Sequence, residues 1–282
     1  MGDQTYSSTA ATEDANGGPG LLSGGVGNGA WDLSESPIGT LERGLLLLEL
    51  FDADNSEMSL NQLRERAGLP KATIQRLVKT LEARKWVAYE PATRKYHLGA
   101  SVLRISYLAA SHSELVRVSH PFLLKLAEET RETASVSVWT DLGPLIVDTV
   151  LTPHHFKPST NIGMILPGIY TADAQVLVAF GPEEAWDSLL AHPVARLTPL
   201  TVTEPQAIRQ RWQTVRQTGV AFDRGEWNSD IPAVAVPVLD RQGQLRGALA
   251  IAPPIERASE EAMAAHAEAL RVAAAAIAER LA

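Results

Sequence analysis

The stretch LNQLRERAGLPKATIQRLVKTLEARKWVAYEPATRKYHLG, residues 60–99, decides the fold of the N-terminal part of this chain. Ser59, the residue before it, and Gln62 have the spacing of a capping box, in which two side chains satisfy the first backbone groups of a helix. Gly68 is typical of a helix C-terminus because glycine tolerates a positive φ. The sequence therefore predicts a short helix between Ser59 and Gly68.

A second helix is predicted for Lys71–Arg84, because its apolar residues recur at intervals of three and four. An earlier apolar stripe at Ile38–Phe51 indicates a further helix with a broad buried face. Two short strand patterns, Trp86–Glu90 and Lys95–Leu98, follow on either side of a Pro-Ala-Thr-Arg turn. Three helices and a hairpin in this order predict a winged helix-turn-helix domain.

The helix Lys71–Arg84 is expected to enter the major groove of DNA, because the second helix of a helix-turn-helix pair reads base edges with its N-terminal residues. Gln suits the two-bond pattern of adenine and Arg that of guanine, so we expect Gln75 and Arg76 to contact bases. Thr73 is expected on a base or a phosphate. The other expected contacts are Lys71 and Lys79 on phosphates, and Arg94, Lys95 and Tyr96 from the wing on the adjacent backbone or minor groove. The alternative is that all of these are ordinary solvent-facing side chains.

Charge is distributed unevenly along the chain. The formal net charge is −8 at pH 7, which by itself would oppose binding to a polyanion. Between Met58 and Arg104, however, there are ten Lys and Arg against three Glu, so this segment carries +7 and the rest of the chain −15. A basic module attached to an acidic body is typical of a nucleic-acid-binding protein, although a solvated basic face would give the same count.

Length and composition set further limits. The chain has 282 residues, enough for two ordinary domains, and its 45% hydrophobic and 21% charged residues are a globular composition. The absence of cysteine excludes disulfides, thiolate zinc sites, iron–sulfur clusters and cysteine nucleophiles, and it fits a cytoplasmic protein. No apolar run approaches the roughly 18 residues of a membrane span, and no basic residue precedes Arg43, so we expect neither a membrane span nor a signal peptide.

The chain divides into four parts by composition and pattern. Residues 1–36 are rich in Gly, Ser, Thr and Ala and are predicted to be a disordered tail. The winged helix-turn-helix is expected at residues 37–100 and a linker helix at residues 101–119. The second domain is expected at residues 120–282 and begins with a helix that carries Pro121 in its first turn.

The second domain mixes strands and helices. Thr203 and Gln206 again have capping-box spacing, with Pro205 in the first turn of the helix that would follow. An α+β fold with an antiparallel sheet accounts for this order of elements. The expected strands are 134–140, 145–151, 233–239 and 245–251, and the expected helices include 171–180, 203–217 and 259–282.

Several segments resemble the IclR family of bacterial transcription regulators, and together they extend over about residues 39–282. The resemblance implies a winged helix, a linker helix and a C-terminal effector-binding domain of GAF-like fold. It also implies dimers formed through the DNA-binding domains and tetramers formed through the effector domains. The segments are residues 60–99, quoted above, GTLERGLLLLELF (39–51), LVRVSHPFLLKLAEETRETASVSV (115–138), RLTPLTVTEPQAIRQRWQTVRQTGVAFDRGEW (196–227) and AVPVLDRQGQLRGALAIAPP (235–254).

The resemblance also places an effector pocket, between the loop that corresponds to Gly163–Ala172 and the segment that corresponds to Gly219–Val238. Family members that bind small oxo-acids hold them with an Asp, a Cys and two Ser. A site that lacks three of these four groups would leave a buried carboxylate without partners, which argues against a small oxo-acid here. Position by position, the Asp falls on Asp223, the Cys on Ala233 and the two Ser on Ala250 and Ala252.

An aromatic or mostly apolar effector, oriented by one or two polar groups, suits the residues that remain. The apolar stretch Met164–Ile169 would line such a pocket, and its alternative role is a hydrophobic plug or an oligomer contact. The expected effector-binding residues are Met164, Ile165, Leu166, Ile169, Thr171, Ala172, Asp223, Trp227, Ala233, Val234, Ala250 and Ala252.

Neither a metal site nor a catalytic centre is expected. His154 and His155 are adjacent, so on a strand they would point to opposite faces. Asp148, Asp223 and Glu226 are not accompanied by a nucleophile arrangement or a phosphate-binding loop.

These features predict a ligand-responsive, DNA-binding transcription regulator that is not an enzyme and needs no cofactor. Its expected partners are double-stranded operator DNA, a small-molecule effector and copies of itself, in a homodimer or a dimer of dimers. We expect it to repress adjacent catabolic genes. The alternative is a metabolite-binding enzyme or module whose N-terminal helices serve assembly only.

Overall fold

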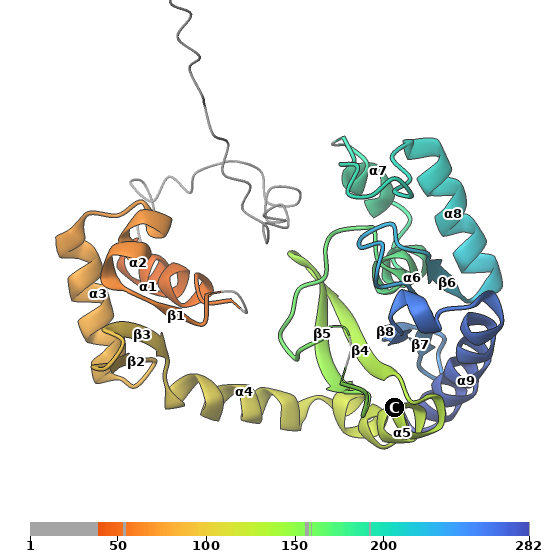
Figure 1. Cartoon of the computed structure of the whole chain (residues 1–282), viewed down its shortest axis with the longest axis horizontal. Helices are drawn as coiled ribbons and strands as arrows, with labels where there is room; N and C mark the ends of the chain where they lie inside the picture. Colours follow the sequence, from red (N-terminus) through yellow and green to blue (C-terminus); the bar gives the residue numbers. More distant parts are fainter. Residues whose placement is uncertain (1–38, 53–54, 156–157, 159, 192, 282) are drawn as a thin grey trace, which may run out of the picture.

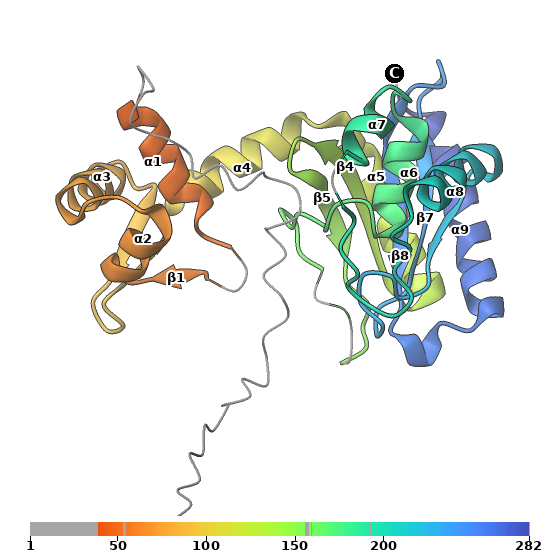
Figure 2. The ribbon, with the colours of Figure 1, turned by 90° about the horizontal axis from the view of Figure 1, so that it is seen from above.

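The computed structural model shows two domains connected by a long helix, α4 (Ala100–His112) (Figure 1). The two domains lie at opposite ends of this helix, and Figure 2 shows the same arrangement from above. No helix among the described residues is long and apolar enough to cross a membrane. The structure describes residues 39–52, 55–155, 158, 160–191 and 193–281, so the tail expected at residues 1–36 lies outside it.

Three helices and a small sheet form the N-terminal domain. The helices α2 and α3 make the helix-turn-helix pair, and β2 and β3 form the wing hairpin, with β1 pairing to the other edge of β3. Leu47, Leu63 and Ile74 come from the three helices and are at most 1% exposed, so they form the centre of the core. The elements are α1 (Gly39–Glu49), β1 (Glu57–Met58), α2 (Leu60–Ala67), α3 (Lys71–Ala83), β2 (Val87–Glu90) and β3 (Lys95–Leu98).

Both ends of α2 have the chemistry that the sequence predicts. Ser59 Oγ accepts a hydrogen bond from the Gln62 backbone N–H at 3.3 Å, and Gln62 Oε1 accepts one from the Ser59 N–H at 2.9 Å. Gly68 ends the helix with φ +64°, a conformation that costs other residues about 1 kcal/mol. The capping box and the glycine therefore determine where α2 ends and where the turn to α3 begins.

The linker and the start of the second domain differ from the expectation. The helix α4 ends before Ser113, which caps a new helix, α5 (Glu114–Thr130), by accepting a hydrogen bond from the Val116 N–H at 3.3 Å. A single helix over residues 101–119 is therefore wrong, and Pro121 lies inside α5 rather than in its first turn. A Ser at the N-cap and a Glu in the first turn satisfy the helix N-terminus, which outweighs the preference of Pro for that place.

A five-stranded antiparallel sheet in the order β5-β4-β8-β7-β6 forms the centre of the C-terminal domain. The helices α5 and α9 cover one face, and α6 covers the other with α8 packed against it (Figures 1 and 2). This arrangement confirms the predicted α+β fold. The elements are β4 (Thr133–Thr140), β5 (Gly143–Val150), α6 (Ala172–Phe180), α7 (Ala185–Leu189), α8 (Pro205–Thr218), β6 (Ala221–Asp223), β7 (Ala233–Leu239), β8 (Leu245–Ala252), a 3-10 turn (Ile255–Arg257) and α9 (Glu260–Ala278).

Successive residues of each strand point to opposite faces of the sheet, and the two faces carry side chains of different size. Val234 and Leu249 belong to the core between the sheet and helices α5 and α9. Ala233 and Ala250 belong to the core on the side of α6. The small alanine side chains let α6 lie close to the strands, so little room is left between α6 and the sheet.

The predicted capping box at Thr203 and Gln206 does not form. The N-cap residue of α8 is Glu204, without a side-chain cap, and Thr203 Oγ1 instead accepts a hydrogen bond from Arg196 Nη2 at 3.3 Å. Pro205 is the first residue of α8, as predicted. The short elements β1, α7 and β6 are also absent from the prediction, because two to five residues carry too little periodicity.

Candidate DNA interface and effector pocket

The helix α3 is divided into a buried face and an exposed face. Ile74, Leu77 and Val78 point into the N-terminal core and are at most 8% exposed. The side chains expected to contact DNA lie on the other face, where Thr73 is half-buried and the following are exposed: Lys71, Gln75, Arg76 and Lys79. The structure thus brings the predicted reading residues together on one surface of one helix.

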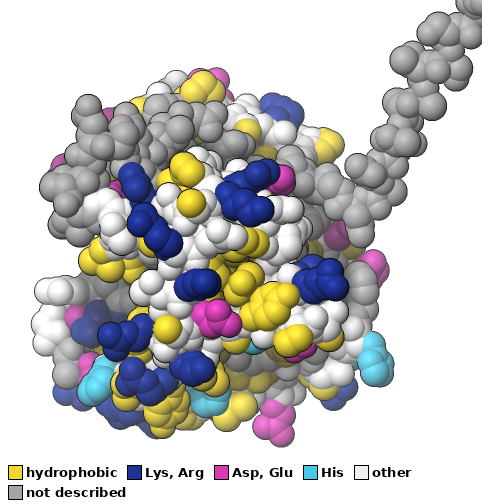
Figure 3. All heavy atoms as spheres, turned by 90° about the vertical axis from the view of Figure 1, so that its left-hand side faces the viewer, with side chains coloured by type: hydrophobic (Ala, Val, Ile, Leu, Met, Phe, Trp, Pro, Cys, Tyr) yellow, Lys and Arg dark blue, Asp and Glu magenta, His cyan; other side chains and the backbone are white. Residues whose placement is uncertain are grey.

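The positive charges of this surface are available for an external anion. In the described part of the chain, Lys71, Arg76 and Lys79 have no ion-pair partner, whereas Arg66 of α2 pairs with Asp52 at 3.5 Å. Figure 3 shows Lys and Arg side chains gathered on the end of the molecule that the N-terminal domain forms. Such a surface attracts the phosphates of a duplex and releases their counterions.

The wing holds its three predicted residues differently. Arg94 is exposed at the turn, where its φ is +56°. Lys95 is half-buried. The Tyr96 ring packs against Tyr89, with 4.9 Å between ring centroids, and burial raises the pKa of its hydroxyl. Arg94 is therefore free to approach DNA, while Tyr96 also supports the hairpin.

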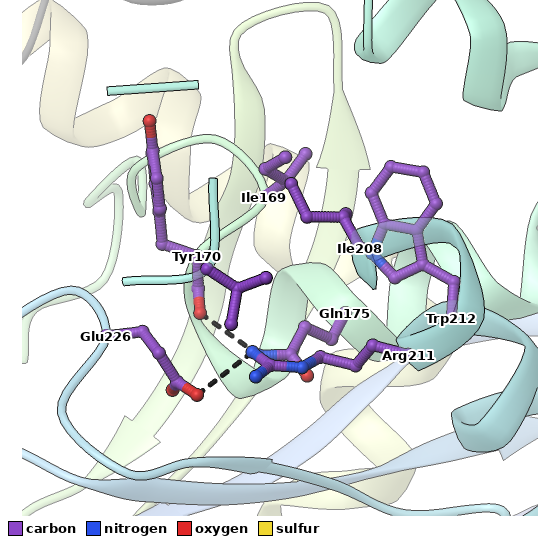
Figure 4. Close-up of a pocket in the computed structure, with 8 residues that line it drawn as sticks. Ile169, Tyr170, Gln175, Ile208, Arg211, Trp212 and Glu226 are labelled. Atoms are coloured by element: carbon purple, nitrogen blue, oxygen red, sulfur yellow. Dashed lines mark hydrogen bonds and ion pairs between the residues drawn. The ribbon is translucent and has the colours of Figure 1, made fainter. Parts of the chain in front are cut away.

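A small pocket lies in the C-terminal domain between α6, α8 and the loops that cover them (Figure 4). Its closed volume is about 10 Å³, which is room for one water molecule. Eight residues line it: Ile169, Tyr170, Gln175, Val202, Ile208, Arg211, Trp212 and Glu226.

Of the residues predicted to bind the effector, only Ile169 lines this pocket. Met164–Leu166 runs beside β5, where the Leu166 N–H donates to Pro144 O at 2.7 Å, so this segment extends the sheet edge. Val234 does not line this pocket, because it points into the core on the opposite face of the sheet. Thr171 caps α6 through its hydroxyl, which accepts a hydrogen bond from the Ala174 N–H at 3.3 Å.

The remaining predicted residues lie on the pocket side of the sheet or next to it. Ala172, Ala233 and Ala250 are part of the core beneath α6, and Ala252 packs against that core. Trp227 follows Glu226 and is half-buried.

Two acidic side chains at the end of β6 are buried side by side. Glu226 Oε1 pairs with Arg211 Nη1 at 2.9 Å, and Glu226 Oε2 accepts a hydrogen bond from the Arg224 N–H at 2.8 Å. Asp223 Oδ1 accepts hydrogen bonds from the N–H groups of Gly225 and Glu226, at 2.9 and 2.7 Å. Hydrogen bonds from the backbone N–H groups of the loop to these two carboxyl groups therefore hold the loop in place.

The environment of Asp223 favours the neutral form of its carboxyl group. Burial, together with the nearby side chain of Glu226 and its negative charge, raises the pKa of Asp223 to about 8, although the backbone hydrogen bonds to Asp223 Oδ1 act in the opposite direction. Asp223 Oδ2 has no hydrogen-bond partner in the described part of the chain. A neutral carboxyl group at this place can donate a hydrogen bond, which an ionised one cannot.

A second buried carboxyl group was missed by the sequence analysis. Asp173, in the first turn of α6, accepts a hydrogen bond from Ser137 Oγ at 2.7 Å, and burial raises its pKa to about 6. The signal for it was an Asp inside the mostly apolar run at 172–180, which also contains Gln175. Asp148, by contrast, lies on the other face of the sheet, where His120 Nδ1 is 2.8 Å from its Oδ2.

The sequence analysis also missed seven of the eight pocket residues. On α8 the signal was an Arg within the stripe formed by Ile208, Trp212 and Val215. The other pocket residues come from segments that are distant in sequence, and no single pattern connects them. Among the described residues, no group of three or more His, Cys, Asp or Glu is close enough to hold a metal ion.

An exposed basic reading helix in a winged domain, linked to a sheet domain that contains a pocket, defines a DNA-binding regulator with a sensor domain. Comparisons with known proteins give the family. The model of the IclR helix-turn-helix domain matches residues 40–91, and the model of the bacterial transcriptional regulator IclR C-terminal domain matches residues 107–279. The chain belongs to the IclR family and is a DNA-binding transcription regulator of that type.

Individual relatives cover most of the chain. The glycerol operon regulatory protein of Streptomyces griseus is 31% identical over 220 residues, which are 78% of this chain and 86% of that protein. The DNA-binding transcriptional repressor YiaJ of Escherichia coli K12 is 30% identical over 230 residues, which are 77% of this chain and 79% of that protein. Both relatives are transcription regulators rather than enzymes.

Solved structures show the same fold. An IclR transcriptional regulator from Silicibacter sp. TM1040 has a TM-score of 0.75 and 29% identity, over 86% of this chain and 95% of that one. An IclR homologue from Microbacterium hydrocarbonoxydans, solved in complex with 4-hydroxybenzoate, has a TM-score of 0.75 and 25% identity, over 86% of this chain and 98% of that one.

Proposed function

We propose that this regulator is a repressor that binds operator DNA through α3 and the wing, and that an aromatic or mostly apolar metabolite releases it. The observation that carries the proposal is the exposed face of α3, where Gln75 and Arg76 can reach bases while Lys71 and Lys79 can reach phosphates. We place the protein in the bacterial cytoplasm, where operator DNA lies.

The choice of repressor rests on the relatives. YiaJ is named as a repressor, and the Streptomyces griseus protein is named for the glycerol operon. A regulator of one operon controls genes of one pathway, so we propose that the genes adjacent to this one are its targets.

The choice of effector rests on the chemistry of the C-terminal domain. Alanines at 233, 250 and 252 offer no hydrogen bonds to a small acid, and Ile169, Val202 and Ile208 give the pocket apolar walls. The Microbacterium hydrocarbonoxydans homologue holds an aromatic compound, 4-hydroxybenzoate. Binding of the ligand would weaken binding of the operator, and binding of the operator would weaken binding of the ligand by the same coupling free energy, about 1 to 3 kcal/mol.

We also propose a homodimer, with a dimer of dimers as the larger assembly. The helix α4 has no buried residue, and Leu103 and Tyr107 on it are 73% and 71% exposed. Leu41 on α1 is 62% exposed. Apolar side chains that are so exposed on α1 and α4 indicate a protein contact, and a dimer would set the spacing of two DNA half-sites.

The test is binding of the full chain to its own upstream DNA, measured by fluorescence anisotropy at low salt. We expect specific binding that the double variant Arg76→Ala/Lys79→Ala weakens by about tenfold or more. Lys125→Ala, an exposed cation on α5, is the matched control and should bind as the wild type does. Equal binding by all three proteins would refute the role of α3.

A further inference from the structure

We infer that the pocket between α6 and α8 binds an uncharged effector through an oxygen atom that accepts a hydrogen bond from Trp212. The inference rests on the proposed sensing function and specifies its ligand class as neutral carbonyl compounds with an apolar body. Neither Trp212 nor Arg211 was among the residues expected from the sequence.

The first observation is an unused donor on a buried ring. Trp212 is 0% exposed, and its Nε1–H has no hydrogen-bond partner in the described part of the chain. Trp186, which packs edge-on against it with 5.4 Å between ring centroids, is buried to the same extent, but its Nε1–H donates to Val178 O at 3.0 Å. Buried indole N–H groups are normally paired, so the unpaired one in the pocket wall points to an external acceptor.

The second observation is a guanidinium group that is only partly used. Arg211 Nη1 pairs with Glu226 Oε1 at 2.9 Å, and within the described residues its other N–H groups have no partner. Both carboxylate oxygens of Glu226 are occupied, because Oε2 accepts the Arg224 N–H. The Arg211 side chain is 31% exposed, so the buried spare donor of the pocket is Trp212 Nε1–H, and the matching group on a ligand is an acceptor oxygen.

Charge decides what kind of acceptor fits. The charges of Arg211 and Glu226 cancel, so the empty pocket is close to neutral. A carboxylate on the ligand would lie beside Glu226 in a buried place, where two like charges repel strongly. A ketone, aldehyde or ester oxygen can accept a hydrogen bond from Trp212 Nε1–H without that repulsion.

The pocket must open to admit such a molecule. Residues 193–204 form a strap over it, which contributes Val202 to the wall. Hydrogen bonds tie the strap to neighbouring segments: the Ala195 N–H donates to Tyr170 Oη at 3.1 Å, Thr198 Oγ1 donates to Gly225 O at 2.7 Å with Glu226 O at 3.5 Å, and Thr201 Oγ1 donates to Glu226 O at 2.7 Å. Figure 4 shows Ile169, Ile208 and the Trp212 ring on one side of the space and Arg211 and Glu226 on the other.

Three probes of similar size test the inference by calorimetric titration of the full chain: acetophenone, ethylbenzene and benzoate. Ethylbenzene lacks the acceptor and benzoate adds the charge. We expect acetophenone to bind about tenfold more tightly than either, which corresponds to one net hydrogen bond. Equal affinity for ethylbenzene, tighter binding of benzoate, or no binding of acetophenone up to millimolar concentration would overturn the inference.

Variants identify the donor. Trp212→Phe keeps an aromatic ring and should lower the affinity for acetophenone by about five- to tenfold, with little change for ethylbenzene. Trp186→Phe is the matched control, since its N–H is already used inside the protein, and it should leave both affinities unchanged. If Trp212→Phe does not fold, the indole ¹⁵N–H resonance of Trp212 in the wild type gives the answer: it should shift downfield with acetophenone and not with ethylbenzene, and an unmoved resonance contradicts the inference.

A measurement of operator binding distinguishes failure of this inference from failure of the proposed function. If acetophenone does not bind while the protein still binds its upstream DNA, the ligand class is wrong and the regulator remains. If operator DNA is not bound either, the proposed function itself fails.

Discussion

The two domains present their functional groups in opposite ways. The reading surface of α3 comes from one helix, Lys71–Ala83, and its side chains point outward, opposite a buried apolar face. The pocket of the C-terminal domain collects residues between Ile169 and Glu226 from two helices, α6 and α8, and three loops. A periodic surface can be read from a sequence because the buried residues determine which side chains face outward, whereas a pocket depends on how distant segments pack.

Truncation of a buried core side chain should have the largest effect on stability. It should destabilise only the domain that contains the side chain. Ile74→Ala removes a fully buried side chain beneath the reading surface, and we expect it to lower the free energy of unfolding of the N-terminal domain by about 2 to 5 kcal/mol. Operator binding should fall with it. The measurement is hydrogen exchange of the α3 amides together with operator affinity.

Leu249→Ala is the matched control in the other domain. Leu249 is equally buried, between the sheet and helices α5 and α9. It should destabilise the C-terminal domain by a similar amount and leave the exchange of the α3 amides unchanged. Loss of protection in both domains from either variant would mean that the domains unfold together, and the comparison drawn above would not hold.

Removal of single side chains from α3 should have the next largest effect and should divide base contacts from phosphate contacts. Arg76→Ala should cost about 1 to 3 kcal/mol of operator binding and relax the preference at one base position. Lys79→Ala should weaken binding to all sequences alike and reduce the slope of log K against log salt by about 1. The measurement is a salt titration with operator and scrambled duplexes, and identical behaviour of the two variants would contradict the assigned roles.

The sequence was informative where a few neighbouring residues determine the structure. The helix-turn-helix follows from the cap at Ser59, the glycine at 68 and the apolar row of α3, all local features. Pro121 misled because a better cap, Ser113, lies eight residues earlier. Trp212 was unassigned because whether a buried N–H finds a partner depends on segments that are distant in sequence, and no local pattern shows this.

The pH dependence of stability tests whether the carboxyl group of Asp223 is protonated in the folded protein. Burial and Glu226 raise the pKa of Asp223 from 3.8 to about 8, so between these values the folded state binds a proton that the unfolded state releases. Stability is therefore lost as pH rises through this window, by up to about 1.4 kcal/mol per pH unit. Asp223→Asn cannot ionise and should lack this loss.

The measurement is urea unfolding followed by Trp fluorescence between pH 5 and 8. Asp173, whose pKa is raised to about 6 by burial, contributes a loss of the same sign in both proteins, so the difference between them isolates Asp223. Parallel pH profiles for the wild type and Asp223→Asn would show that Asp223 is ionised in the folded protein.

The smallest effect on stability is expected from a comparison of two capping boxes that look alike in the sequence. Ser59 makes both of its expected bonds with Gln62, so Ser59→Ala should cost about 1 kcal/mol of stability in the N-terminal domain. Thr203 makes no cap and accepts only the bond from Arg196, so Thr203→Ala should cost less than about 0.5 kcal/mol. Chemical denaturation of both variants checks the difference. Equal costs would mean that Thr203 caps α8 in solution, as the spacing predicts, and that Glu204 is not the N-cap residue.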